Sequence, residues 1–132
     1  MSTFQSLEEA QTYFVNDRFA TLNGVHLDAL TERGCVASMT LDERHLNANG
    51  GVMGGVMFTL ADFAFAVACN NEHKPTVAIN VNINYLSAPK GKALTATAEM
   101  IKSGKTTCVC NVMVRDDTGR DIALFVGTGY KL

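Results

Sequence analysis

Several features that mark other classes of protein are missing from this sequence. Its 11 Lys and Arg residues are balanced by 13 Asp and Glu residues, and the basic residues do not cluster as they do in proteins that bind nucleic acid. The first ten residues contain no basic region followed by an apolar one, the pattern of a secretory signal. We therefore expect a cytoplasmic protein that binds neither nucleic acid nor membrane.

The cysteines also lack the spacing of a metal or redox site. None of the four belongs to a C-x-x-C pair, and no histidine stands at metal-ligand spacing. We expect reduced, buried thiols of the kind found in cytosolic proteins. We likewise expect no metal and no redox cofactor. The cysteines are Cys35, Cys69, Cys108 and Cys110.

No repeat, linker or low-complexity tract divides the chain. Its 132 residues, 47% of them hydrophobic and 18% charged, suit one domain with a single core. We predict a single domain over residues 1–132, with an N-terminal helical segment over residues 1–20 packed on it. In that segment Ser6 and Glu9 form a capping-box pair before a short amphipathic helix over residues 7–18.

One apolar run stands out, from Gly54 to Cys69. Asp62 is its one charged residue and Thr59 its one other polar residue, within about sixteen positions. A bilayer span needs roughly 20 residues, and a helix that is apolar on all sides must be wrapped by other structure. At helical pitch Gly55 and Asp62 lie on one side of such a helix, two turns apart. We predict a buried central helix with a lone carboxylate that must be explained.

Six strands are expected around this helix, two before it and four after it. The clearest has one apolar face, formed by alternate residues from Val77 to Tyr85, and one polar face that includes Asn80. This order predicts an α+β fold in which a curved antiparallel sheet of about six strands wraps the central helix. A second copy would cover the remaining helix surface and any free sheet edge, so we expect a homodimer or homotetramer. The strands are predicted over residues 25–31, 35–41, 76–85, 94–102, 106–115 and 121–130.

The segment from His45 to Asp62 carries a recognisable motif. It resembles the pattern H-x-N-x-x-G-x-x-H-G-G-x-x-x-x-L-A-D of hotdog-fold acyl-CoA thioesterases, nearest to the phenylacetate-pathway (PaaI-type) enzymes and their 4-hydroxybenzoyl-CoA thioesterase-like relatives. The resemblance continues through residues 82–86, 102–105 and 123–131, and it covers roughly residues 25–131. It implies the hotdog fold and the hydrolysis of an aromatic or medium- to long-chain acyl-CoA to a carboxylic acid and coenzyme A.

The resemblance also implies roles for individual residues. Asp62 would act as general base on a water or as nucleophile on the thioester carbonyl, and the Gly55 amide would donate to the carbonyl oxygen. Asn47, by default a turn former, would orient the water or the carboxylate. In the family the helix of one subunit meets the loop of another, so the site would be shared across a dimer. Residues expected to contact the substrate are Met53, Gly54, Phe63, Asn80 and Lys105.

Two positions depart from the family pattern. Met53 stands where the motif has His, and a thioether donates no hydrogen bond. Ala78 stands where some relatives carry Ser or Thr, and Asn80 on the same face could take that role. These departures favour an alternative function, a hotdog module that binds acyl-CoA or acyl carrier without turnover. A hydratase would require an Asp–His pair that is not seen around Asp62.

Overall fold

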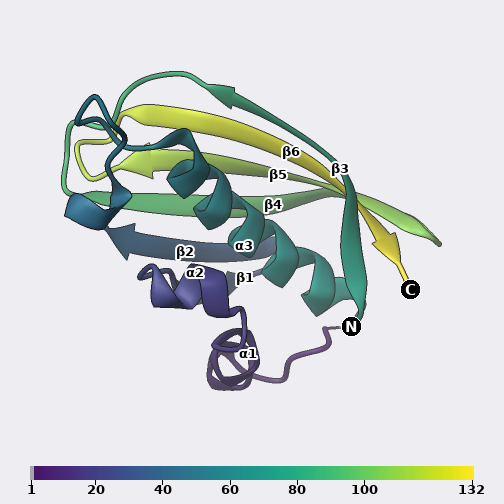
Figure 1. Cartoon of the computed structure of the whole chain (residues 1–132). Helices are drawn as coiled ribbons and strands as arrows, with labels where there is room; N and C mark the ends of the chain where they lie inside the picture. Colours follow the sequence, from purple (N-terminus) through teal and green to yellow (C-terminus); the bar gives the residue numbers. More distant parts are fainter. Residues whose placement is uncertain (1) are drawn as a thin grey trace.

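The structure is a computed structural model that describes residues 2–132, and its elements follow the predicted order. Two short helices precede two strands, a long helix and four further strands (Figure 1). The elements are α1 (Leu7–Phe14), α2 (Arg18–Leu22), β1 (His26–Thr31), β2 (Gly34–Thr40), η1 (Glu43–His45), α3 (Gly54–Glu72), β3 (Thr76–Tyr85), β4 (Ala93–Ser103), β5 (Thr107–Asp116) and β6 (Asp121–Lys131).

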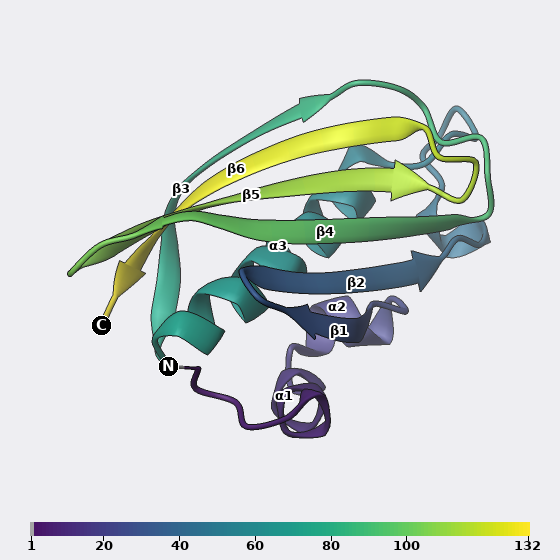
Figure 2. The same cartoon turned by 180° about the vertical axis from the view of Figure 1, so that it is seen from behind.

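The six strands form one antiparallel sheet in the order β1-β2-β4-β5-β6-β3. The sheet curves, and α3 lies along its concave face while the opposite face is bare (Figures 1 and 2). Strand β3 follows α3 in the chain and pairs with β6, which places it at one edge of the sheet. The predicted fold class, a curved sheet around one central helix, is confirmed.

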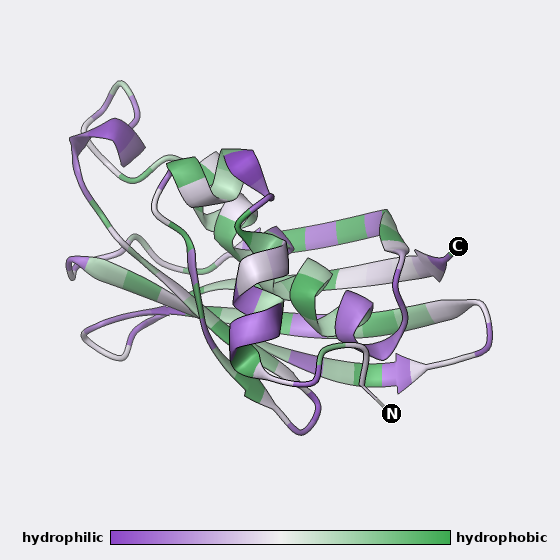
Figure 3. Ribbon diagram, turned by 90° about the horizontal axis from the view of Figure 1, so that it is seen from below, coloured by the Kyte–Doolittle hydropathy of each residue, from purple (hydrophilic) through white to green (hydrophobic). Residues whose placement is uncertain are grey.

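The core forms where α3 meets the sheet. Strands alternate between hydrophilic and hydrophobic residues (Figure 3), and their apolar side chains meet the helix. The rings of Phe58 and Phe65 lie 5.5 and 5.7 Å from that of Phe125 on β6, in tilted or edge-on geometry. Among residues 2–132, no helix is long and apolar enough to cross a membrane.

The N-terminal helix predicted over residues 7–18 is instead two helices. Ser6 caps α1 by accepting a hydrogen bond from the Glu9 amide at 3.1 Å, as predicted, but the Glu9 carboxylate accepts from the Gln5 amide at 3.2 Å and not from that of Ser6, so the predicted capping box is only half formed. The helix ends at Phe14, and the Asn16 side chain donates to the Tyr13 carbonyl. Asn and Asp side chains compete with helical backbone bonds in this way, so the chain turns at Asp17 before α2 begins.

Helix α3 runs three residues beyond the predicted end at Cys69, to Glu72. The buried Asn70 holds this last turn, because its side chain donates to the Ala66 carbonyl at 2.8 Å and accepts from the Thr76 amide at 2.9 Å. A buried amide needs such partners. Its hydrogen bonds therefore join the end of α3 to the start of β3, a link that hydrophobic periodicity does not show.

The uninterrupted alternation predicted for β3 is also wrong. A bulge between Ala78 and Asn80 breaks the register with β6, so Ile79 has no partner across the pair. Ile79 is 58% exposed, while Val81 and Ile83 beyond the bulge pack against the core. The apolar face of this edge strand is therefore covered only along its second half.

All four cysteines are buried thiols, as the sequence predicted. The Sγ atoms of Cys69 and Cys108 lie 3.4 Å apart between α3 and β5, and Cys35 donates to the Ala64 carbonyl. Burial raises the pKa of the Cys35 thiol, so it remains protonated and unreactive. These side chains serve as small core residues.

The contact between β2 and β4 yields a test of the packing. A Cβ on Gly34 would lie 1.9 Å from the Ala98 carbonyl oxygen, and a backbone atom cannot rotate away. We expect Gly34→Ala to lower the free energy of unfolding by about 2 kcal/mol or more. Gly51→Ala is the control, because its Cβ would meet nothing closer than 3.8 Å. Equal urea midpoints for the two variants would contradict this packing.

Candidate functional site

The loop before α3 is built around Asn47. Its side-chain oxygen accepts from the amides of Asn49 and Gly51 at 2.9 and 3.1 Å, and its backbone amide donates to the Gly51 carbonyl at 2.7 Å. Gly50 adopts a positive φ of 82° within this turn. Asn47 thus shapes the loop that brings the chain to the start of α3, and its side chain remains exposed.

The two glycines at the start of α3 are required for different reasons. A Cβ on Gly54 would lie 3.1 Å from the ring of Tyr85, whose hydroxyl donates to the Gly54 carbonyl at 3.0 Å. A Cβ on Gly55 would meet only the tip of Met53, at 3.7 Å. The packing within the chain therefore does not explain a glycine at 55. An open backbone amide in the first helical turn is suited to receive a ligand oxygen.

A cavity of about 360 Å³ opens beside this amide. Most of its wall is apolar, and it lies between α2, the end of β2 and the first turns of α3. Thr59 borders it, but its hydroxyl donates to the Gly55 carbonyl at 2.7 Å. The cavity is lined by Phe19, Asn23, Met39, Arg44, His45, Met53, Gly55, Val56, Phe58 and Thr59.

Asp62 borders a second cavity, of about 330 Å³, further along the same helix. Its carboxylate is half-buried and forms no ion pair with any Lys, Arg or His of residues 2–132. Burial, and then the negative charge of Asp17 across the cavity, raise the pKa of Asp62. Arg18 borders the same cavity but forms no ion pair with Asp62, so the carboxylate lacks the paired cation that a structural role would require.

His45 and Arg44 bind the loop to α2. The His45 ring is buried: its Nδ1 accepts from the Asp42 amide at 3.0 Å, and its Nε2 lies 2.9 Å from the Asn23 carbonyl. A carbonyl only accepts, so the proton is assigned to Nε2. Arg44 donates to the Leu22 carbonyl at 2.8 Å. Both side chains position the backbone.

The other predicted substrate contacts are scattered in a single chain. Asn80 is exposed on the edge strand β3, and Lys105 lies in the turn between β4 and β5, toward the opposite end of α3 from Gly55 (Figure 1). Phe63 is buried against Phe14, with 5.8 Å between ring centroids. One cavity brings together the predicted residues Met53 and Gly55, and a second brings together Asp62 and Phe63.

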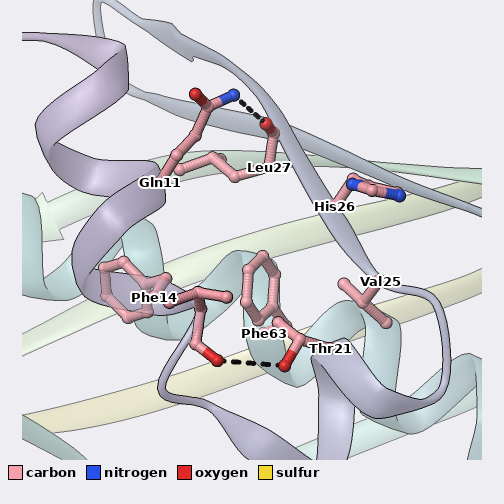
Figure 4. Close-up of a pocket in the computed structure, with 8 residues that line it drawn as sticks. Gln11, Phe14, Thr21, Val25, His26, Leu27 and Phe63 are labelled. Atoms are coloured by element: carbon pink, nitrogen blue, oxygen red, sulfur yellow. Dashed lines mark hydrogen bonds between the residues drawn. The ribbon is translucent and has the colours of Figure 1, made fainter.

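Phe63 separates the Asp62 cavity from a larger one of about 430 Å³ beneath the N-terminal helices (Figure 4). Two of the polar side chains of this larger cavity are already used, since Gln11 donates to the Leu27 carbonyl at 2.7 Å and Thr21 to the Val15 carbonyl at 3.0 Å; His26 is the third. This cavity contains no carboxylate. We therefore place the candidate site at the two cavities along α3.

Sequence reasoning missed the contribution of α2 to this site. Asp17 and Phe19 border the cavities, yet the expected helix ended at residue 18 and gave Phe19 no place. The available signal was an aromatic residue directly after the polar run from Asn16 to Arg18. Sequence reasoning also missed the hydrogen bond from the Tyr85 hydroxyl to the Gly54 carbonyl, because it joins segments far apart in sequence. The strand pattern placed Tyr85 only on the apolar face.

Within the described part of the chain, no three His, Cys, Asp or Glu side chains are arranged to hold a metal ion. The charged groups at the two cavities are the carboxylates of Asp17 and Asp62 and the guanidiniums of Arg18 and Arg44, and the Gly55 backbone amide opens beside them. Such a set can activate a water and stabilise a developing oxyanion.

Comparison with known proteins agrees with this arrangement. The model of the thioesterase superfamily matches residues 49–123. The acyl-coenzyme A thioesterase PaaI of Escherichia coli (strain K12) is 32% identical over 126 residues, which cover 95% of this chain and 90% of that protein.

Solved structures show the same hotdog architecture. The E. coli PaaI protein from the phenylacetic acid degradation operon superimposes with a TM-score of 0.88 at 32% identity, covering 95% of this chain and 91% of that one. A hypothetical thioesterase from Streptococcus pneumoniae TIGR4, solved with coenzyme A, gives a TM-score of 0.82 at 26% identity and covers 91% and 94%.

The two carboxylates at the Asp62 cavity predict a measurable coupling. We expect the pKa of Asp62 to lie above that of an ordinary Asp, and to fall in Asp17→Asn, because removing a nearby negative charge favours ionisation. Carboxyl ¹³C NMR titration of labelled aspartates measures this. Asp28→Asn, on β1 away from the cavity, should leave the Asp62 titration unchanged. An identical titration in wild type and Asp17→Asn would show that the two carboxylates do not interact.

Proposed function

This chain belongs to the thioesterase superfamily and is a thioester hydrolase, and we propose that its substrates are aromatic or medium- to long-chain acyl-CoA thioesters. The observation that carries the proposal is an unpaired, half-buried carboxylate on the same helix as an open backbone amide at its start. The apolar cavity of about 360 Å³ beside that amide supports an acyl group as the occupant.

The proposed reaction starts with a water held by Asp62. The carboxylate takes one proton from the water, and the oxygen attacks the thioester carbonyl carbon. Negative charge moves to the carbonyl oxygen, where the Gly55 amide and the dipole of α3 stabilise it. The raised pKa of Asp62 favours this general-base role over direct attack, because a stronger base accepts the proton more readily.

The intermediate then collapses with cleavage of the carbon–sulfur bond. Coenzyme A leaves as a thiolate, and the proton held by Asp62 neutralises it. A thiol has a pKa near 8.5, so the leaving group needs little protonation in the transition state. The proposed mechanism therefore requires neither a second acid at the site nor a metal or redox cofactor.

We place each complete site between two copies of the chain. Seven residues of helix separate Gly55 from Asp62, a rise of about 10 Å, whereas the attacked carbon must lie within roughly 3 Å of the activated water and the oxyanion donor. One chain cannot satisfy both. The exposed edge strand β3, with Val77 and Ile79 uncovered, supports pairing with a second copy.

Met53 changes the expected efficiency of the reaction. It is the N-terminal cap residue of α3, is 55% exposed, and makes no side-chain cap hydrogen bond. Loss of one oxyanion donor costs on the order of 10²–10³ in rate. The Gly55 amide is a backbone group and remains available whatever side chain stands at 53. We therefore propose slower turnover without loss of the reaction.

The cellular setting in this proposal is the cytoplasm. Reduced thiols persist there, and all four cysteines of the chain are buried and unpaired. The substrate, with its phosphates and adenine, is itself a cytoplasmic metabolite carrier. Lys105 is proposed to meet the coenzyme A portion from the partner copy, since it lies far from Gly55 within one chain.

Two inactive variants test both the chemistry and the sharing of the site. Asp62→Asn should lower kcat by at least about 10²-fold because it removes the base. Gly55→Pro should lower kcat by about 10²–10³-fold because it removes the amide donor. Proline is tolerated in the first turn of a helix, so this variant should still fold. Thiol release from acyl-CoA panels measures the rates.

Coexpression of the two variants with different tags gives mixed dimers. If the site is shared, each mixed dimer contains one site with an intact Gly55 and an intact Asp62, and random mixing returns about a quarter of wild-type activity. If each chain carries its own site, the mixture remains inactive. Binding of acyl-CoA by wild type without thiol release would instead establish the non-catalytic alternative.

A further inference from the structure

Phe19 stands apart from the other exposed apolar residues of the N-terminal segment. It is 73% exposed, and a single exposed apolar residue is ordinary. Phe19, however, borders both the cavity at Gly55 and the cavity at Asp62. Leu22, one turn further along α2 and 72% exposed, borders neither.

Three residues border both cavities, and two of them belong to α3 itself. Phe58 and Thr59 form the floor, since they lie on the helix that carries Gly55 and Asp62. Thr59 is engaged with the Gly55 carbonyl, and the Phe58 ring packs against Phe125. Phe19 is the residue that reaches this boundary from a different element. Its ring has no aromatic partner among residues 2–132.

Helix α2 is too short to be stable alone, yet its last turn is held from two sides. Thr21 donates to the carbonyl of Val15, in the segment before the helix, at 3.0 Å. Arg44 and His45 bind the carbonyls of Leu22, the last residue of α2, and Asn23, the residue after it, at 2.8 and 2.9 Å. Those two residues belong to the loop that leads into α3. The position of Phe19 is therefore fixed relative to the Gly55 amide.

We propose that Phe19 is a specificity-determining residue, whose ring divides the two cavities and limits the size of the acyl group that the site accepts. The inference rests on the proposed function, because it takes the acyl group of a thioester as the occupant. The ring presents a rigid apolar surface with two side-chain torsions. An acyl group that extends past Gly55 meets this surface before it reaches the second cavity.

The size of the side chain at 19 should then set acyl preference in both directions. Phe19→Ala joins the cavities of about 360 and 330 Å³ and should favour bulky acyl groups. Phe19→Trp should favour small ones. We expect the ratio of kcat/KM for palmitoyl-CoA over hexanoyl-CoA to rise by about tenfold or more in Phe19→Ala and to fall in Phe19→Trp. Benzoyl-CoA provides an aromatic third substrate.

Leu22→Ala is the matched control. It removes an equally exposed apolar side chain from the same helix, and the substrate ratio should remain that of wild type. Because Phe19 is exposed, its variants should keep the wild-type melting temperature, and Phe19→Leu replaces Phe19→Ala if the latter does not fold. Unchanged ratios in both Phe19→Trp and the smaller variant would overturn the proposal.

Binding measurements separate the role of Phe19 from the proposed function. If wild type hydrolyses none of the three thioesters, the proposed function fails, and the role of Phe19 is then tested by binding alone. Calorimetric Kd values for non-hydrolysable thioether analogues with the same acyl groups should show the same shift in ratio. Equal Kd ratios in wild type and the Phe19 variants, or no binding of any analogue by wild type, would reject the role of Phe19.

Discussion

The fixed spacing of two groups on one helix governs the whole arrangement. Helix α3 cannot stretch, so the Gly55 amide and the Asp62 carboxylate stay two turns apart. The carbonyl carbon and oxygen of one thioester lie much closer together than two turns of helix. In the proposed reaction the catalytic pair is therefore completed by a second copy of the chain, for which the exposed start of α3 at Gly55 and the open edge at β3 are available. Under this proposal each chain supplies two half-sites, and each half-site needs a partner.

The same helix sets the electrostatics of the site. Its apolar surroundings withdraw water from Asp62, which makes the charged form costly and the carboxylate a stronger base. Asp17, at the start of α2, adds to this effect, and no Lys, Arg or His among residues 2–132 forms an ion pair with Asp62. At the start of α3, the free amides of the first turn favour negative charge. In the proposed reaction, helix α3 thus holds both the base and the oxyanion donor.

Sequence patterns predicted this fold well where one helix or strand face is buried. The alternation along β2 reflects one buried face, and the unbroken apolar run of α3 reflects burial on most sides, so the pattern of apolar residues alone located both elements. The misses were the break at Asn16–Asp17, the last turn of α3 that Asn70 holds, and the bulge at Ile79. Each of these features depends on a hydrogen bond or a strand register that involves one particular partner residue. The periodicity of apolar residues does not indicate which residues are partners.

In the site, too, residues that stand out in the sequence were predicted, whereas the contribution of α2 depends on particular hydrogen-bond partners and was missed. Asp62 was singled out because a carboxylate is conspicuous within an apolar run, and the role of Gly55 followed from the resemblance of its motif. Phe19 is conspicuous only once Arg44 and His45 are seen to hold the carbonyls of Leu22 and Asn23. Those two side chains lie in the motif that leads to α3, yet they act on α2 and make no bond to the α3 backbone. The loop therefore positions two elements at once: α3, which carries the proposed catalytic groups, and the short helix beside its cavities.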